Sequence, residues 1–512
     1  MVSSHTENTK RIAKNTLMLY VRMLFGMLVS LYTSRVVLNT LGVEDYGIYN
    51  VVGGVVAMFS LLSTALSTSI SRFITFEIGR GDEYNLKKVF TSSVAVMFVL
   101  SIAIFIVAEI IGVWFLNVHL NIPVQRLDAA NWVLQCAILA FAVDLNSVPY
   151  TSAMIAHERM SAFAYLGILN ITLRFVIVYV LYVSCFDKLM TYSVLTLSVS
   201  ILMCLIDYSY CRIHFVECTF RIIYDKSLLK KMLSFAGWSF LGNGAYLLNT
   251  QGVNILMNMF FGVAVNAARG IAGQVDSAVQ SFVVNFTTAM NPQIIKSYAA
   301  GDLNYMHTLV CRGAKYSYFM TFFFAVPLVL EAQQVLSIWL VEVPEHAVMF
   351  VRLTLLSSLA VVVANTLFTA QLATGKIKKY QITVTLFGIW VLPLSYLFFK
   401  LGFPPEIAYI VYFAIYFGLI FVRIYLVKDL IKMPWMKYVK EVLLRMGLVS
   451  VCSVILPCLV YFNMPSSFIR LLVVCMVSAL SSAAFMYFLG LEKGERIFVI
   501  SKIQNKIHSF KH

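Results

Sequence analysis

The stretch AKNTLMLYVRMLFGMLVSLYTSRVVL, residues 13–38, is the first of a long series of apolar segments, and it carries Arg22 about a third of the way along. Of the 512 residues in the chain, 60% are hydrophobic and only 12% are charged. The mean hydropathy is +0.83, and a water-soluble fold cannot bury this much apolar surface. Apolar segments of this length cross a bilayer as helices. The sequence therefore predicts an all-α integral membrane protein.

Apolar segments of roughly 20 residues, the length that spans a bilayer, indicate about fourteen transmembrane helices. They run over residues 13–38, 46–74, 89–116, 129–150, 163–183, 191–210, 232–260, 265–290, 316–330, 347–370, 382–399, 407–427, 442–462 and 471–491. The polar start of the chain is followed by a span that lacks the cleavage site of a secretory signal, so we expect the first helix to be retained.

Basic residues collect in alternate loops, which predicts the orientation of the chain. The loops on one side, together with both termini, are rich in lysine and arginine, whereas several loops on the other side are acidic. The basic side includes Lys10, Arg80, Lys87, Lys88, Arg159, Lys230, Lys231, Lys296, Lys376, Lys428 and Lys437. We expect both termini in the cytoplasm, which requires an even number of helices. The net charge of +15 then reflects topology, and nucleic acid binding is not implied.

The chain also contains an internal repeat with an offset of 220 residues. In this register Gly42-Val43 falls on Gly262-Val263, and Gly81-Asp82 falls on Gly301-Asp302. Two six-helix lobes in pseudo-twofold arrangement are implied, related by an axis along the membrane normal. We expect an N-lobe over 1–212, a cytoplasmic linker over 213–231, a C-lobe over 232–428, and two further helices with a cytoplasmic tail over 429–512. The cleft between the lobes is the expected substrate site.

Arg22, Arg174 and Arg269 lie inside predicted spans, and none has a carboxylate three or four residues away. A charged side chain in hydrocarbon is costly, so it usually faces an aqueous cavity or a partner. The flat guanidinium also matches phosphate geometry. We therefore expect these arginines to bind an anionic substrate. Arg35 lies near the outer end of its span, where it could either join them or extend to the lipid headgroups.

Polar residues in two later spans fall on single helix faces. Arg269, Gly273, Asp276 and Gln280 share one face, and Asn243 and Asn254 share a sector of the preceding span. Such stripes cannot face lipid comfortably. We consider Asn243, Asn254 and Gln280 candidate substrate-binding residues. The alternative is that these amides form hydrogen-bonded seams between helices.

Two carboxylates inside the spans, Asp144 and Asp276, could carry a coupling proton or sodium ion. Alternatively, each could pair with an arginine from another helix. A third, Asp207, lies near the cytoplasmic end of its span, where we expect it to be solvated.

The sequence carries no motif for metal binding or for ATP hydrolysis. The histidines and cysteines lack metal-ligand spacing, and no phosphate-binding GxxxxGK[ST] motif occurs. We therefore expect no metal, no cofactor and no ATP hydrolysis. A membrane enzyme such as a polysaccharide polymerase or ligase would need a sizeable outer loop, and the outer loops here are short.

Several stretches resemble bacterial polysaccharide exporters of the MATE-like superfamily, which also contains multidrug exporters and lipid II flippases. They are residues 34–38 (SRVVL), 41–49 (LGVEDYGIY), 154–160 (MIAHERM), 235–239 (FAGWS), 261–275 (FGVAVNAARGIAGQV) and 291–298 (NPQIIKSY). The resemblance covers most of the chain.

This resemblance implies an inner-membrane flippase, not an enzyme, that moves undecaprenyl-diphosphate-linked oligosaccharide outward by alternating access for surface polysaccharide or lipopolysaccharide synthesis. By likeness to lipid II flippases, Arg22 and Arg269 are the first candidates to bind the diphosphate. Expected partners are the lipid-linked oligosaccharide, membrane lipids, a coupling H+ or Na+, and other polysaccharide assembly proteins. The alternative is an ion-coupled multidrug or cation antiporter of the same fold.

Overall fold

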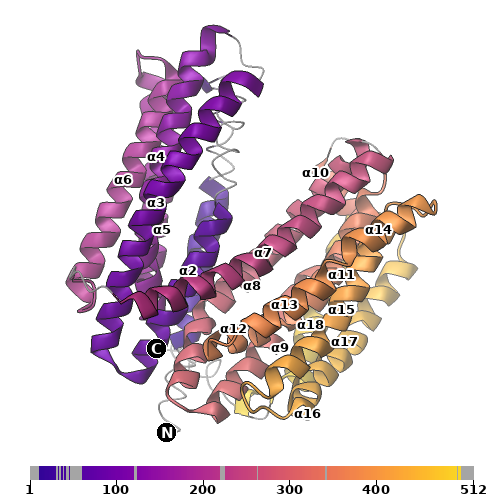
Figure 1. Ribbon diagram of the computed structural model, residues 1–512. Helices are drawn as coiled ribbons and strands as arrows, with labels where there is room; N and C mark the ends of the chain where they lie inside the picture. The colour runs from indigo at the N-terminus through magenta and orange to yellow at the C-terminus, as the bar shows by residue number, and fades with distance from the viewer. Residues whose placement is uncertain are drawn as a thin grey trace, which may run out of the picture. The chain divides into compact units, whose positions relative to one another are not determined.

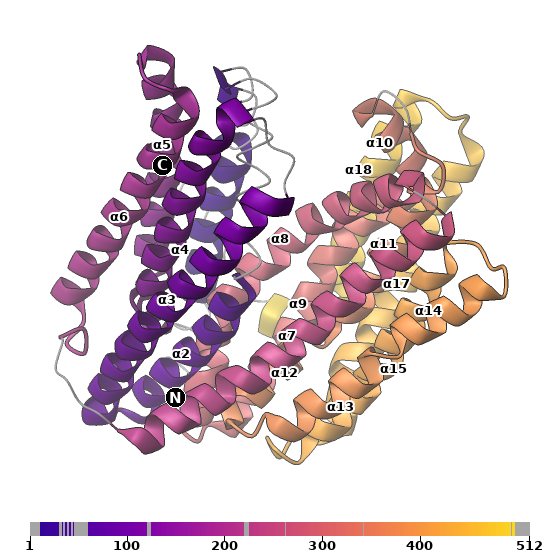
Figure 2. The same cartoon turned by 45° about the horizontal axis from the view of Figure 1, so that its top comes forward.

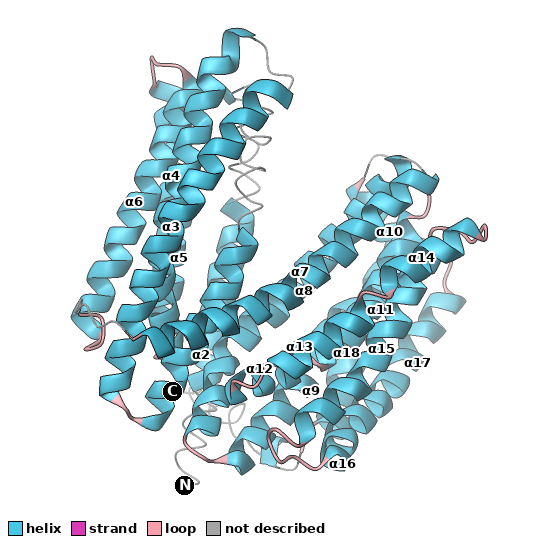
Figure 3. Ribbon diagram, in the orientation of Figure 1, coloured by secondary structure: helices cyan, strands magenta, loops and turns pink. Residues whose placement is uncertain are grey.

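The computed structural model describes residues 11–29, 60–119, 124–219, 225–261, 263–340, 343–492 and 494–496, together with Thr33, Val36, Val37, Thr40, Leu41 and Asp45. Within these residues every regular element is a helix and none is a strand (Figure 3). The predicted all-α class is confirmed.

The first helix covers Arg11–Val29. The helices that follow it towards the middle of the chain are α2 (Ser60–Arg80), α3 (Glu83–His119), η1 (Val124–Arg126), α4 (Leu127–Ala156), α5 (Met160–Val183), α6 (Lys188–His214), α7 (Lys226–Phe261) and α8 (Val263–Ala299). Those of the remaining chain are α9 (Leu303–Leu330), α10 (Ala332–Trp339), α11 (Ala347–Val363), α12 (Asn365–Thr374), α13 (Lys378–Gly388), α14 (Val391–Lys400), α15 (Ile407–Lys428), α16 (Trp435–Tyr438), η2 (Val439–Leu444), α17 (Arg445–Asn463), α18 (Phe468–Phe485) and η3 (Met486–Gly490).

Eleven helical segments among the described residues are long and apolar enough to cross a membrane, which makes the chain a multi-pass membrane protein. Four of these segments combine shorter elements: α11 with α12, α13 with α14, α16 with η2 and α17, and α18 with η3. Three further long helices, α2, α7 and α8, are not among the eleven. The stripe on α8, which carries Arg269, Asp276 and Gln280, illustrates their more polar character. The number fourteen therefore stays a prediction.

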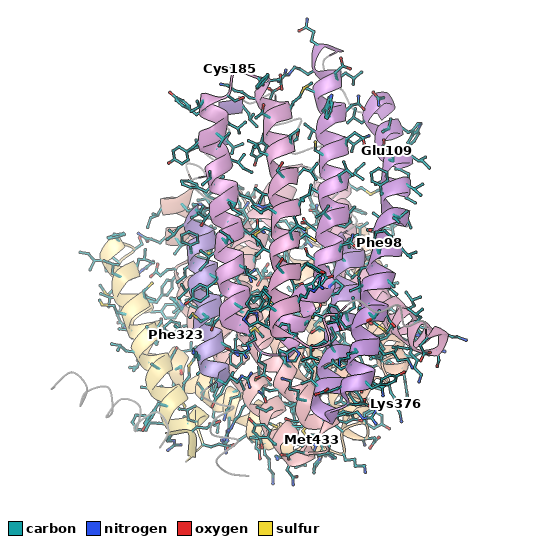
Figure 4. The ribbon with its side chains drawn as sticks, turned by 90° about the vertical axis from the view of Figure 1, so that its left-hand side faces the viewer. Phe98, Glu109, Cys185, Phe323, Lys376 and Met433 are labelled. Atoms are coloured by element: carbon teal, nitrogen blue, oxygen red, sulfur yellow. The ribbon has the colours of Figure 1, made fainter. Side chains whose placement is uncertain are left out.

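The chain divides into two compact units. Unit 1 comprises Met1–Gly244 and Thr288–Asp302, and unit 2 comprises Ala245–Thr287 and Leu303–His512. In unit 1, α4 packs against α3 and α6, and α5 lies beside α6 (Figure 1). Figure 4 labels Phe98 and Glu109 on α3, with Glu109 nearer to the end of the helices at which Cys185 lies. Phe98 is 58% exposed, which suits a ring that contacts lipid.

In unit 2, α15 packs against α11, α13 and α14 (Figure 2). The core between α8, α11 and α15 includes Phe350, Leu355 and Leu419, each 1% exposed or less. Two ion pairs connect the end of the described chain to α9 and to the residue that follows α9, one from Arg470 on α18 and one from Glu495 after η3. Arg470 makes a two-bond contact with Glu331, at 2.8 and 3.0 Å, and Lys315 Nζ lies 3.0 Å from Glu495.

The turns after α2 and α8 repeat the same backbone pattern in the 220-residue register. Gly81 and Gly301 have φ of +71° and +78°, a region that glycine adopts without steric cost. The amides of Gly81 and Gly301 donate to Ile78 and Tyr298, and those of Asp82 and Asp302 donate to Glu77 and Ser297. The two turns thus end their helices in the same way, as an internal repeat requires.

A second repeated feature is an ion pair that joins corresponding segments in each of the two repeats. In unit 1, Arg126 binds both Asp187 and Asp45. In unit 2, His346 Nδ1 lies 2.5 Å from Glu406. Position 346 corresponds to position 126 in the repeat register, and 406 corresponds to 187 within one residue. The contact therefore occurs in both repeats, although a histidine replaces the arginine.

Candidate functional site

The stripe on α8 forms one wall of a polar cavity inside unit 2. The cavity has a volume of about 660 Å³, within the range of small-molecule sites. Arg269, Asp276 and Gln280 line it, as the helical spacing predicted. Gly270 and Gly273 lie on the same wall, and a Cβ atom added at either would meet nothing within 4 Å. The small residues thus leave open space between the charged ends of the stripe.

Four other helices line the cavity. From α7 come Asn249, Thr250 and Asn254; α11 contributes Thr354, Ser357 and Ser358; α14 contributes Val391; and α15 contributes Tyr409 and Tyr412. The wall therefore combines hydroxyl and amide groups with two aromatic rings. Such a surface can bind a polar ligand and stack against a ring.

Arg269 brings a positive charge to this cavity. Its Nη2 donates to the backbone oxygen of Thr250 at 3.0 Å, and its guanidinium carbon lies 5.5 Å from the ring centroid of Tyr409. Among the described residues, no carboxylate forms an ion pair with Arg269. A guanidinium has five N–H donors, so several remain for a ligand in the cavity.

Asp276 places a carboxyl group at the other end of the stripe. The hydroxyl of Ser358 donates to its Oδ1 at 2.5 Å. Arg269 is seven residues away, roughly 10 Å along the helix axis, so the two side chains are not an ion pair. The alternative that Asp276 pairs with an arginine from another helix finds no support among the described side chains, because the partner seen is a serine. The cavity therefore presents a cation and a carboxylate at separate places.

Arg22 occupies a different environment in unit 1. Its guanidinium carbon lies 4.5 Å from the ring centroid of Phe163 on α5. A Cβ atom added at Gly167 would lie 2.6 Å from its Nε, so the side chain rests directly on this glycine. Within the described part of the chain Arg22 has no ion pair. That Arg22 faces a central cleft stays a prediction.

Arg174 is exposed on α5 and donates from its Nε to Oδ1 of Asn170 at 3.0 Å. It also lies within electrostatic range of Asp144 on α4. The expectation that Asp207 is solvated is wrong, because its side chain is only 6% exposed and lies within electrostatic range of Asp144. The α4–α6 contact places these two carboxylates near each other, which the sequence alone did not reveal.

Two candidates remain without a structural account, since Arg35 and the side chain of Asn243 lie outside the described residues. Among the other candidates, the cavity of unit 2 brings together Asn254, Arg269, Asp276 and Gln280. It does not include Arg22, Arg174 or Asp144, which belong to unit 1.

Asn249 was not among the predicted residues, although it lines the cavity and donates to the backbone oxygen of Gly388 at 2.8 Å. Glu109 was not among them either, and it accepts a hydrogen bond from Gln135 inside unit 1. A carboxylate inside an apolar segment was the available signal for Glu109.

A further missed residue is Glu158, in the turn between α4 and α5. It is 3% exposed and has a φ of +59°, which is unusual outside glycine. Its carboxylate lies 2.5 Å from Lys296 Nζ, 2.5 Å from Gln293 Nε2 and 3.3 Å from Arg11 Nε. Glu158 thereby ties the first helix to the end of α8. The sequence MIAHERM, 154–160, gave no indication of this role.

The described residues contain no group of three or more His, Cys, Asp or Glu side chains able to hold a metal ion.

Comparisons with known proteins agree with this architecture. Residues 12–297, more than half of the chain, match the sequence model of the family described as "Polysaccharide biosynthesis protein". No curated protein matches the chain significantly in sequence.

Solved structures share the fold at low sequence identity. A crystal structure of a MATE point mutant has a TM-score of 0.72 and 14% identity, over 82% of this chain and 96% of that one. An outward-facing multidrug resistance MATE transporter of the MOP superfamily has a TM-score of 0.69 and 15% identity, over 82% and 97%. A MOP superfamily transporter from Pyrococcus furiosus, whose binding pocket is described as reversed in polarity, has 0.67 and 15%, over 82% and 96%. At these identities the likeness concerns the fold alone. The chain belongs to the polysaccharide biosynthesis protein family and has the fold of the MATE-like membrane transporters.

Proposed function

We propose that the protein is a flippase for oligosaccharide linked to undecaprenyl diphosphate, working by alternating access in the bacterial inner membrane with both termini in the cytoplasm. The observation that carries this proposal is Arg269, a cation on the wall of the unit 2 cavity without a carboxylate partner among the described side chains. A diphosphate needs charge-assisted hydrogen bonds when it leaves water. Membership of a polysaccharide biosynthesis family supports a glycan-bearing cargo.

The remaining cavity residues suit the sugar part of such a cargo. Asn254, Gln280 and Ser357 can exchange hydrogen bonds with hydroxyl groups, and Tyr409 offers a ring face for stacking. In this proposal Arg22 and Arg174 supply further positive charge from unit 1. Arg35 and Asn243 keep the same proposed role in binding substrate.

The second candidate is an ion-coupled multidrug or cation antiporter. Asp276 favours it, because a carboxylate on the same wall could hold a cationic drug. A MATE multidrug transporter is also among the structures that share the fold. The two functions predict cargoes of opposite charge. An assay of surface glycans and an assay of drug sensitivity therefore distinguish the flippase from the antiporter.

For coupling, we propose that Asp276 or Asp144 carries the driving H+ or Na+. Replacing each by asparagine keeps the shape and removes the titratable charge. We expect at least one of Asp276→Asn and Asp144→Asn to retain substrate binding and lose dependence of transport on the ion gradient. If both variants keep gradient-driven transport, the carboxylates have structural roles only.

A deletion strain tests the function. We expect loss of one surface glycan, restored by the wild-type gene and not by Arg269→Lys, since lysine keeps the charge and loses the planar fork of donors. The matched control is Arg352→Lys, because Arg352 also lies in unit 2 but binds the backbone oxygen of Val329, away from this cavity. Normal surface glycans with altered drug sensitivity would favour the antiporter.

A further inference from the structure

A second charged pocket lies within unit 1, where the end of α2, the start of α3 and the start of α7 meet. Its volume is about 360 Å³. Its lining includes Arg72, Arg80, Lys88 and Lys231 as cations, and Glu77 and Asp225 as carboxylates. We call this the α2–α3–α7 pocket. It is separate from the proposed transport cavity, which lies in unit 2.

The charges of the pocket are only partly neutralised from within. Both carboxylate oxygens of Asp225 already have partners within the protein. Its Oδ2 lies 2.5 Å from Lys88 Nζ, and its Oδ1 accepts hydrogen bonds from the amides of Ser227 and Leu228 at 2.8 and 3.0 Å. These contacts hold the pKa of Asp225 below its ordinary value, with the hydrogen bond from Lys88 as the largest cause. Glu77 is the remaining carboxylate, against Arg72, Arg80 and Lys231. The pocket therefore keeps an excess of positive charge.

Two aromatic rings, Phe73 and Phe76, line the pocket beside its cations. The guanidinium carbon of Arg72 lies 4.6 and 4.7 Å from the ring centroids of Phe73 and Phe76. The guanidinium carbon of Arg80 lies 5.8 Å from the ring centroid of Phe76. Cations beside aromatic rings suit a ligand with a negative group attached to an apolar chain.

The position of the pocket along its helices also favours a ligand with a negative group attached to an apolar chain. Arg80 is the last residue of α2, and Lys88 lies in the second turn of α3, a helix that is apolar enough to span the membrane from Glu83 onward. Side chains at this depth meet the headgroup layer, where basic pockets between helices bind anionic headgroups. We propose that the α2–α3–α7 pocket binds the phosphate-bearing headgroup of an anionic membrane lipid. The proposal holds whether or not the unit 2 cavity carries a diphosphate.

Native mass spectrometry of the full chain can test this site, with micelles containing phosphatidylglycerol and phosphatidylcholine in equal amounts. The ratio of the two lipids retained should favour phosphatidylglycerol. We expect this preference to fall about fivefold for each basic residue removed, in Arg80→Gln and in Lys231→Gln, which corresponds to about 1 kcal/mol per charge at a membrane surface. Lys230→Gln is the matched control, because Lys230 lies on the same helix and does not line the pocket.

Asp225→Asn should change the lipid preference in the opposite direction to Arg80→Gln and Lys231→Gln. Asparagine retains an oxygen to accept the amides at the start of α7 but releases Lys88 from its ion pair, so the preference for phosphatidylglycerol should rise. A misfolded variant would not produce such a gain. The proposal is overturned if Arg80→Gln and Lys231→Gln behave like Lys230→Gln, if Asp225→Asn lowers the preference, or if excess inorganic phosphate displaces the lipid, which would make the ligand a free anion.

Discussion

Arg22 in unit 1 and Arg269 in unit 2 are both arginines inside helices, yet their surroundings differ in kind. Arg22 is stacked on Phe163 and rests on Gly167. Arg269 borders a cavity of about 660 Å³ with open space at the neighbouring Gly270 and Gly273. The carboxylates differ in the same sense, since Glu158 is enclosed by cations and Asp276 faces the cavity. Similar residues thus contact neighbouring side chains closely in one unit and border an open cavity in the other.

The largest effect should come from the enclosed carboxylate. Glu158→Gln leaves Lys296 and Arg11 without their buried partner, which we expect to destabilise the protein by about 3–5 kcal/mol. Asp276→Asn keeps the hydrogen bond from Ser358 and should cost less than about 1 kcal/mol. Denaturant unfolding in detergent measures both. Equal losses of stability would remove the distinction between the two carboxylates.

A smaller difference is expected at the glycines. A methyl group at Gly167 must push Arg22 off Phe163, so Gly167→Ala should cost roughly 1–3 kcal/mol. Gly273→Ala adds its methyl group to open space inside a helix and should leave stability unchanged or raise it by up to about 1 kcal/mol. Thermal unfolding compares the two, and a loss at Gly273 as large as that at Gly167 would mean that the cavity is not open there.

The smallest effect concerns the ion pair between Arg126 and Asp187 and its dependence on pH. Although partial burial opposes it, the hydrogen bonds from the Met190 amide and from Arg126 lower the pKa of Asp187. A carboxyl with a lowered pKa adds stability above the ordinary range of Asp, near 3.9, and this stability is lost as the pH falls through the lowered value.

The contribution of this ion pair can be tested at Arg126. Arg126→Gln removes the guanidinium hydrogen bond that helps to lower the pKa of Asp187, so the dependence of stability on acid pH should become weaker. The measurement is the melting temperature of the wild type and the variant as the pH falls through the range in which Asp is protonated, near 3.9. An unchanged pH profile in the variant would show that the pair does not contribute to stability.

The sequence predicted the features that depend on local periodicity. The 3.6-residue period of α8 correctly placed Arg269, Asp276 and Gln280 on one face, and that face lines the cavity. The 220-residue register aligned Gly81-Asp82 with Gly301-Asp302, and both pairs lie in turns with the same backbone pattern. Hydropathy predicted the helical class.

Features that depend on contacts between distant helices were not predictable. No local pattern indicates that Gly167 receives Arg22, that Ser358 binds Asp276, or that Asp207 is buried beside Asp144. Glu158 lies in a short turn that reads as solvated, and only the approach of Lys296 and Arg11 buries its charge. The partner of a charged residue is set by helix packing, which a single sequence does not encode locally.

The central claim is that the unit 2 cavity carries an anionic lipid-linked glycan, and the most direct measurement is the flipping rate of undecaprenyl-diphosphate-linked oligosaccharide in proteoliposomes. We predict that the wild-type protein flips this lipid and that Arg269→Lys and Arg269→Gln lower the rate by about tenfold or more, as expected for losing hydrogen bonds between charged groups. Arg352→Lys should flip at the wild-type rate. A wild-type protein that leaves the lipid in place but moves a cationic drug, or an Arg269→Gln variant that flips normally, would contradict the account.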